Sequence, residues 1–244
     1  GAARWLGDRW YHRLVQPSHR AMHELDRYAE FLAGLGWQPS ESRVSALTAP
    51  PGPPPTNLVD FILVIPDASS PLKSWPMSNF EQLAHQLADQ TTAPIVFAGA
   101  PGAKKPRDEF IQWREGVFSD LTGRTETAEF LRLIAGARLI VTNDSAGLHL
   151  GVALGRPVVA VAGGGLPQRY HPYPADTGPA RLWIAENRLP CYGCNWKCIY
   201  PVAAGAPAYC VGSVTVGQVL DAVLGLGLDA PSLAQSQTGP AARP

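Results

Sequence analysis

The stretch LIVTNDSAGLHLGVALGRPVVAVA, residues 139–162, decides the fold because it holds two apolar runs separated by a helical segment. Residues 139–142 form the first run and residues 157–162 the second, while residues 145–154 suit a short helix that stops at Gly155. Continuous apolar runs of this length are typical of strands buried on both faces, and a helical crossover makes such strands parallel.

The same alternation continues outward along the chain. Residues 61–65 (FILVI) and 94–98 (PIVFA) predict two further buried strands. Amphipathic spacing predicts helices at residues 78–90, 107–116 (the weakest pattern), 126–136 and 215–225. Strands that alternate with helices predict an α/β fold with a Rossmann-like, doubly wound parallel sheet, which binds its ligands at the carboxyl ends of its strands.

Three segments fall outside this alternation, so the domain itself is expected at residues 58–228. Residues 1–38 are basic and helical in pattern. Residues 39–57 contain six prolines, which predicts a stiff linker. Residues 229–244 are rich in Ala, Gln, Ser and Pro, and we expect a disordered tail there.

Composition excludes several classes of function. The 244 residues carry 20 basic and 20 acidic side chains, a formal net charge of zero, which argues against a nucleic-acid-binding protein. Apolar residues make up 45% and charged residues 16%, so a sizeable core can form. No apolar run is long enough to cross a bilayer, and the first residues lack the pattern of a signal peptide. We therefore expect a cytoplasmic protein.

The turn that follows residues 139–142 is a candidate anion site. Asp144 or Ser145 can cap the helix, and Ala146 and Gly147 leave its first amides uncrowded. A helix N-terminus at the carboxyl end of a strand suits a diphosphate. The alternative is an ordinary capped helix, and His149, one turn further on, is uninformative alone.

A second candidate lies directly after residues 61–65, in the loop PDASSPLKSWP. Lys73 follows Ser69 and Ser70 there, and an ammonium group beside two hydroxyls would suit a phosphate. The alternative is a solvated loop lysine.

All four cysteines, Cys191, Cys194, Cys198 and Cys210, lie within twenty residues, with the spacing C-x2-C-x3-C-x11-C. Four thiolates at this density in a cytoplasmic protein favour a structural metal, zinc or iron, at a closed site. Two disulfides and an iron–sulfur cluster are the alternatives.

Together these motifs resemble glycosyltransferase family 9, the ADP-heptose:lipopolysaccharide heptosyltransferases. Lys73, Trp75 and Pro76 match an S-x-K-x-W-P-like stretch, and residues 123–125 match a G-x-T segment. Residues 142–163 match TNDSGxxHLAAALGxPVVALFG, with Ala146 in place of a usual Gly. The family's cysteine cluster and final helix also have counterparts here.

The resemblance implies the C-terminal, donor-binding half of a GT-B fold, with a truncated N-terminal part of which residues 1–38 are a helical remnant. It implies an ADP-heptose-like donor and transfer, with inversion and without a catalytic metal, to a saccharide or protein hydroxyl in lipopolysaccharide biosynthesis. The residues that it assigns to the donor are Ser69, Lys73 and Asp144–Ser145–Ala146–Gly147 at the diphosphate, Thr125 near the adenosine and His149 in the same pocket.

Three departures from the family pattern accompany these matches. The carboxylate expected to deprotonate the acceptor would precede Gly1, so the catalytic base is unassigned. In the family, the loop that follows the strand matching residues 94–98 usually supplies a Glu that contacts the ribose. Here that loop has no acidic residue until Asp108. Asp67 replaces a usual Gly, which would repel the phosphates unless the carboxylate points away or binds the ribose.

Two alternative functions follow from these departures. One is a non-catalytic or degenerate sugar-nucleotide-binding module that works with a partner chain. The other is a metal-stabilised assembly protein in which the cysteine loop forms a subunit contact. Peripheral membrane association and an oligomeric state are left open by the sequence.

Overall fold

Six short strands form one parallel sheet in the computed structural model, which describes residues 15, 18, 22–38, 47–103, 105–106, 108, 116–174 and 181–226. The strands are β1 (Ile62–Ile65), β2 (Ile95–Phe97), β3 (Phe118–Asp120), β4 (Leu139–Asn143), β5 (Val158–Val161) and β6 (Leu182–Ala185). Their order is β3-β2-β1-β4-β5-β6, and every neighbouring pair is parallel. This is the Rossmann order, so the α/β, doubly wound fold predicted from the sequence is confirmed.

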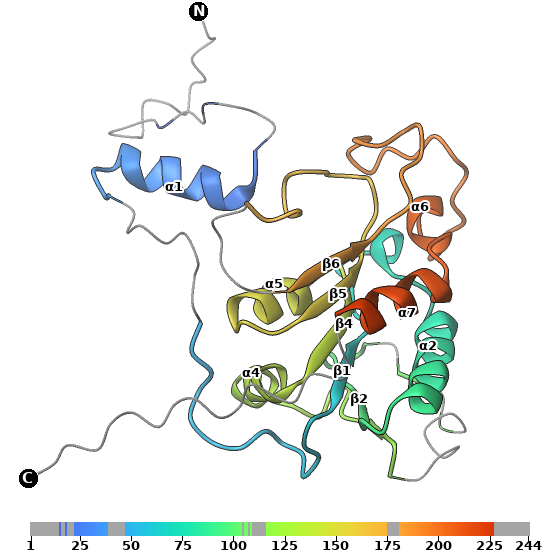
Figure 1. Ribbon diagram of the computed structural model, residues 1–244. Coiled ribbons are helices and arrows are strands. Elements are labelled where there is room, and N and C mark those ends of the chain that lie inside the picture. The colour runs from blue at the N-terminus through green and yellow to red at the C-terminus, as the bar shows by residue number, and fades with distance from the viewer. Residues whose placement is uncertain are drawn as a thin grey trace, which may run out of the picture. The chain divides into compact units, whose positions relative to one another are not determined.

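Helices cover both faces of the sheet (Figure 1). The helices α2 (Met77–Gln90) and α7 (Val216–Gly225) lie on one face, and α4 (Thr127–Gly136) and α5 (Ala146–Ala153) lie on the other. Every residue of β1, β2, β4 and β5 is buried, which explains why these strands are continuous apolar runs. The strand order reverses between β1 and β4, where Ile65 is in register with Thr142, and this switch point is where such folds bind ligands.

The two outer strands were not predicted. β3 reads FSD and β6 reads LWIA, and both are only partly buried because each lies at an edge of the sheet. An edge strand needs no continuous apolar run, which explains why FSD gave a weak signal, whereas LWIA is such a run and was overlooked. The helix expected near residues 107–116 and the tail at 229–244 fall almost wholly outside the described residues.

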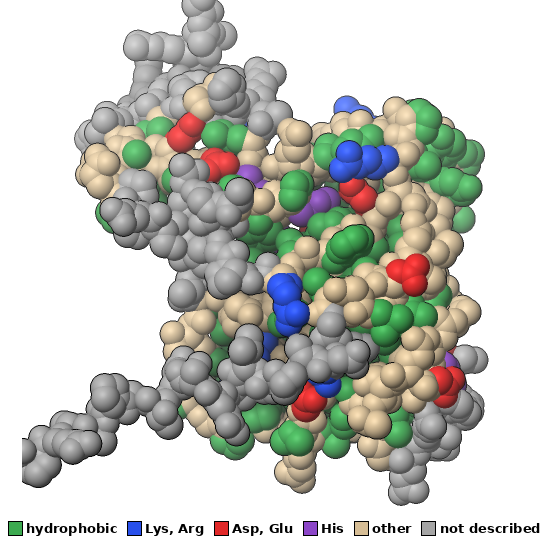
Figure 2. Space-filling model, viewed as in Figure 1, with side chains coloured by type: hydrophobic (Ala, Val, Ile, Leu, Met, Phe, Trp, Pro, Cys, Tyr) green, Lys and Arg blue, Asp and Glu red, His purple; other side chains and the backbone are tan. Residues whose placement is uncertain are grey.

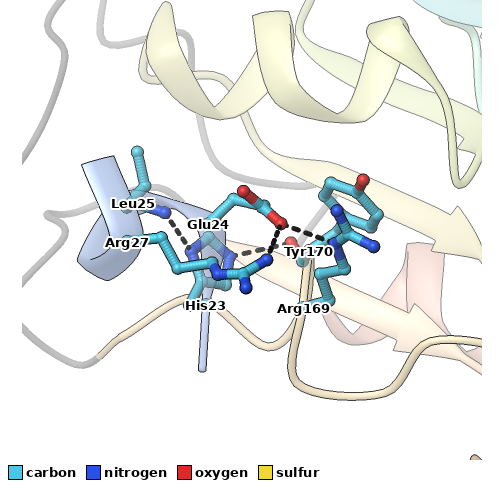
Figure 3. A network of polar contacts seen from close by, with 6 residues as sticks. All are labelled: His23, Glu24, Leu25, Arg27, Arg169 and Tyr170. Atoms are coloured by element: carbon cyan, nitrogen blue, oxygen red, sulfur yellow. Dashed lines mark hydrogen bonds and ion pairs between the residues drawn. The ribbon is translucent and has the colours of Figure 1, made fainter. Parts of the chain in front are cut away.

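The chain divides into two compact units, Gly1–Ser45 with Leu166–Gly178, and Ala46–Gly165 with Pro179–Pro244. The first contains α1 (Glu24–Gly34), which begins at an unusual cap, His23. Its Nδ1 accepts a hydrogen bond from the Leu25 amide (3.2 Å), and its Nε2 donates to the Tyr170 carbonyl (2.9 Å), as Figure 3 shows. The neutral ring thus ties the helix to residues 166–174 of the same unit.

Ion pairs add to this connection. Glu24 Oε1 accepts from Arg169 Nε (2.5 Å) and from Arg27 (3.3 Å) (Figure 3). Burial raises the pKa of Glu24, but the hydrogen bonds and charges of Arg169 and Arg27 outweigh it, so its pKa lies below the ordinary value. Within the part of the chain that the structure describes, no helix is both long enough and apolar enough to span a bilayer.

Candidate functional site

Lys73 and Asp144 meet at the carboxyl edge of the sheet, between β1 and β4. Lys73 ends the 3-10 helix η2 (Pro71–Lys73), which Ser70 caps through the Leu72 amide (3.3 Å). Its Nζ lies 3.1 Å from Asp144 Oδ2, and the two side chains are only 17% and 7% exposed. An ion pair this sheltered is weakly screened by salt and fixes the position of the ammonium group. The two motifs that the sequence analysis assigned separately to phosphate binding therefore form one site.

Asn143 holds the two loops of this site together, a role that the sequence analysis did not assign. It is fully buried at the end of β4. Its Nδ2 donates to the Pro66 carbonyl (2.7 Å), and its Oδ1 accepts from the Trp75 amide (3.0 Å). The loop from β1 is thereby anchored on both sides of Lys73. An Asn that ends an otherwise apolar buried strand is the one sequence signal that could have revealed it.

The N-terminus of α5 lies directly beside this pair. Ser145 occupies the N-cap position, but its side chain caps no amide of the first turn and lies 3.3 Å from Thr142 Oγ1 instead. Amides at such a terminus present a positive partial charge and donors for an anion. Gly147 is required for packing, since a Cβ there would lie 2.8 Å from Thr142 Oγ1 and 3.0 Å from Ile65 Cδ1.

Asp67 points along the edge of the sheet to the loop after β2. Its Oδ2 accepts a hydrogen bond from the Ala100 amide (2.7 Å). Burial raises the pKa of this carboxyl, and the Ala100 hydrogen bond offsets only part of that effect. The adjoining Gly99 carbonyl accepts from the Gly123 amide (2.9 Å), so the loops after β1, β2 and β3 are linked.

The other predicted donor residues lie around this edge. Ser69 is exposed in the loop after β1, Ala146 is exposed at the start of α5, and His149 is partly buried one turn along that helix. Thr125 is partly buried two residues after Gly123, just before α4. The structure brings Lys73, Asp144, Ser145 and Gly147 together. The contacts of all the predicted residues with a donor stay predictions.

The cysteine-containing loop lies against the segment that follows β5. The amides of Gly193 and Asn195 donate to the carbonyls of Gly164 and Gly165, both at 2.7 Å. Between Cys194 and Cys198, Trp196 places its ring 5.3 Å from Lys73 Nζ. No pattern in the sequence indicates that this loop reaches the Lys73–Asp144 pair.

All four cysteines are free thiols, so the structure does not contain the alternative pair of disulfides. Burial raises the pKa of the Cys198 thiol, and the charges of Cys194, Cys210 and Cys191 raise it further. Among the residues that the structure describes, no group of three or more His, Cys, Asp or Glu side chains is arranged to hold a metal ion. The metal site stays a prediction.

Charge is sparse on the molecular surface. On the face shown in Figure 2, basic and acidic side chains are scattered among apolar and neutral groups, without a broad patch of one sign. This agrees with the zero formal net charge of the sequence. Affinity for an anion would therefore come from the local arrangement at Lys73 and α5.

Comparison with known protein families supports one family. The model of glycosyltransferase family 9 (heptosyltransferase) matches residues 34–195. Lipopolysaccharide heptosyltransferase 2 of Escherichia coli (strain K12) is 32% identical over 122 residues, which make up 49% of this chain and 35% of that enzyme. The matched part thus spans about a third of the length of this relative.

Solved structures agree on the fold. Escherichia coli heptosyltransferase WaaC with ADP-2-deoxy-2-fluoro heptose superposes with a TM-score of 0.55 at 19% identity, covering 91% of this chain and 61% of that chain. The iron-containing dodecameric glycosyltransferase TibC from enterotoxigenic Escherichia coli H10407 gives 0.52 at 17% identity, covering 74% and 47%. Both likenesses show that this chain has the architecture of roughly half of a GT-B enzyme.

Proposed function

The chain belongs to glycosyltransferase family 9, and from this membership we propose that it binds the nucleotide diphosphate of an ADP-heptose-like donor at the carboxyl edge of its sheet. The observation that carries the proposal is the Lys73–Asp144 pair, 3.1 Å apart beside the N-terminus of α5. An ammonium group next to a helix N-terminus at the switch point of the sheet is an arrangement that suits a phosphate.

The reaction that we propose is transfer of the sugar to a hydroxyl. The acceptor oxygen attacks the anomeric carbon from the face opposite the diphosphate, its proton passes to a base, and the bond to the departing phosphate oxygen breaks. ADP leaves with the electron pair, so negative charge grows next to Lys73 and the α5 amides, which stabilise it. The base is not assigned to a residue of this chain.

The acceptor that we propose is a saccharide or protein hydroxyl, and the setting a cytoplasmic step of lipopolysaccharide biosynthesis. Support comes from the Escherichia coli relative, which is a lipopolysaccharide heptosyltransferase. An oligomeric state is part of the same proposal, because the TibC neighbour is dodecameric.

A structural zinc or iron ion bound by Cys191, Cys194, Cys198 and Cys210 completes the proposal. The donor set fits, since thiolates are the preferred ligands of both metals in closed sites. Among the described residues the four thiols are not arranged around one point, so the support for the ion is their residue type and their spacing along the chain. Such an ion would fix the loop without taking part in the transfer.

Calorimetric titration with ADP and with ADP-heptose tests the donor site. We expect saturable binding that Lys73→Ala weakens by about tenfold or more, equivalent to about 1.4 kcal/mol. Arg138→Ala is the matched control, because Arg138 also forms an ion pair, with Asp60 (2.9 Å), but precedes β4 at the opposite edge of the sheet. Absence of binding to the folded chain would contradict the proposal. Binding of donor without transfer to any acceptor would favour the non-catalytic module.

A further inference from the structure

Trp196 contacts the ammonium group of Lys73 through its aromatic face. Lys73 Nζ stands over the indole ring, 5.3 Å from its centroid, which is within the range of cation–π attraction. The same ammonium group is paired with Asp144 at 3.1 Å. Two groups of different chemistry, a carboxylate and an aromatic face, therefore hold this ammonium group in place.

The contact is built into the backbone after β5. A Cβ at Gly165 would lie 2.3 Å from Trp196 Cε2, and a Cβ at Gly163 would lie 2.9 Å from its Cη2. The indole can approach this segment only because both positions are glycine. The hydrogen bond from the Asn195 amide to the Gly165 carbonyl (2.7 Å) fixes the loop in the same register.

The local backbone conformation is costly at Trp196. Asn195 and Trp196 have φ angles of 51° and 61°, in the left-handed region, which Asn tolerates but a bulky residue such as Trp disfavours. The indole Nε1 is buried and has no hydrogen-bond partner among the residues that the structure describes. Packing on the glycines and the backbone hydrogen bonds must offset both costs, so the placement of Trp196 is specified by its surroundings.

The geometry points to Trp196 as a positioning residue for Lys73, through which the cysteine-containing loop becomes part of the donor-diphosphate site. A carboxylate that holds the ammonium group also repels an incoming phosphate, whereas an aromatic face attracts the cation and carries no net negative charge. Trp196 therefore keeps the ammonium group at the carboxyl edge of β4 while leaving its charge available to the diphosphate. This inference rests on the proposed nucleotide site.

A double-mutant cycle of ADP binding tests whether Trp196 acts through Lys73. We expect Trp196→Leu to weaken ADP binding about three- to tenfold, and Trp196→Phe, which keeps an aromatic face, to stay within about twofold of the wild type. In a Lys73→Met background, Trp196→Leu should have no further effect. Trp183→Leu is the matched control, because Trp183 is an exposed tryptophan on β6. Equal losses in both backgrounds, or a Phe variant as weak as the Leu variant, would overturn the inference.

Fluorinated tryptophan tests the same contact without changing its shape, which covers the case in which Trp196→Leu fails to fold. Fluorination withdraws charge from the ring face, so the fluorinated wild type should bind ADP about threefold more weakly than the unlabelled protein. The Trp196→Phe variant should be unaffected by the same labelling, although its six other tryptophans are replaced. An equal effect on both proteins would refute the role of Trp196.

A measurement made without nucleotide distinguishes a failure of the proposed nucleotide site from a failure of the Trp196–Lys73 contact. The rate at which a lysine-selective acylating reagent modifies Lys73, followed by mass spectrometry, should rise in Trp196→Leu and stay unchanged in Trp196→Phe. If ADP fails to bind the wild type while this rate still responds to Trp196, the nucleotide site is wrong and the Trp196–Lys73 contact stands. An unchanged rate in Trp196→Leu would overturn the contact itself.

Discussion

Asp67 Oδ2 accepts a hydrogen bond from the Ala100 amide at 2.7 Å, so the carboxylate that follows β1 is directed to the loop after β2. The sequence raised the concern that Asp67 would repel the phosphates of a donor. In the structure this carboxylate instead has a hydrogen-bond partner within the protein, and that bond joins the loops after β1 and β2. A Cβ at Gly99 would lie 2.6 Å from Oδ2, so a glycine is needed to admit the carboxylate.

The protonation of Asp67 should affect how the free energy of unfolding depends on pH. Burial raises its pKa above the ordinary 3.8, so over the window just above that value the folded protein keeps a proton that the unfolded chain has lost. The free energy of unfolding should therefore fall as pH rises through the raised pKa. Urea unfolding between pH 3.5 and 6.5 measures this, and Asp67→Asn should lack that part of the pH dependence. The same slope in both proteins would contradict the assignment.

The contribution of Glu24 to the pH dependence of the free energy of unfolding should have the opposite sign. Its pKa is lowered, so its contribution to stability is fully present above about 4.5 and is lost as pH falls through the lower, folded value. Because its partner Arg169 is 41% exposed, we expect an effect below about 1 kcal/mol. Urea titrations of Glu24→Gln at pH 3 to 6 should show less acid destabilisation than the wild type. Arg169→Gln removes the same ion pair and should reproduce that result. If both variants lose as much stability at low pH as the wild type, the role of the Glu24–Arg169 pair is contradicted.

Gly147→Ala and Gly225→Ala form a matched pair of helix substitutions. At Gly147 the added methyl group would lie 2.8 Å from Thr142 Oγ1, so we expect a loss of about 1–3 kcal/mol in the free energy of unfolding. At Gly225, the last residue of α7, no atom of the described part of the chain lies within 4 Å of an added Cβ, and alanine should be neutral or stabilising by about 0.5 kcal/mol. Denaturant unfolding distinguishes the two, and a Gly147→Ala protein as stable as the wild type would show that α5 can shift.

The parts of the fold that the sequence predicts are those whose signal is local. β1, β2, β4 and β5 are apolar because both faces are covered, and their parallel arrangement follows from the alternation with helices. β3 escapes prediction because an edge strand such as FSD carries no apolar run, whereas LWIA in β6 is a short apolar run that the sequence analysis overlooked. The two loops that we propose to bind phosphate were recognisable from residue type and position along the chain.

The relations within the site were not predictable, because they depend on tertiary structure. Lys73 and Asp144 are separated by 71 positions, and only the adjacency of β1 and β4 joins them. Trp196 reaches Lys73 through a left-handed turn and a glycine surface, and neither leaves a periodic pattern. Asn143 belonged to a recognised motif, yet its hydrogen bonds to Pro66 and Trp75 emerge only from the packed loops.

Asn143→Ala should therefore damage both stability and binding. It leaves the Trp75 amide and the Pro66 carbonyl without their buried partner, so we expect a loss of about 2–4 kcal/mol in the free energy of unfolding. Because Lys73 lies in the loop thus released, ADP binding should weaken as well. Asn187→Ala is the control, since Asn187 bonds to Ser213 (3.1 Å) and Gln218 (3.0 Å). Unchanged ADP affinity in a destabilised Asn143→Ala protein would show that the anchor serves folding alone.

The proposed metal makes the last prediction, because it links the cysteine-containing loop to the donor site. Protein purified without chelator should contain about one zinc or iron ion per chain by elemental analysis, and Cys198→Ser or Cys210→Ser should lose it. His85→Gln, which changes a ligand-type residue on α2, should retain it. Removal of the metal frees the loop that carries Trp196, so thermal stability should fall and ADP affinity should drop to that of Trp196→Leu. If a metal-free chain has an unchanged melting temperature, the metal is not part of the structure and that proposal is wrong. If metal loss leaves the ADP affinity unchanged, the glycines after β5 are sufficient to hold Trp196 over Lys73.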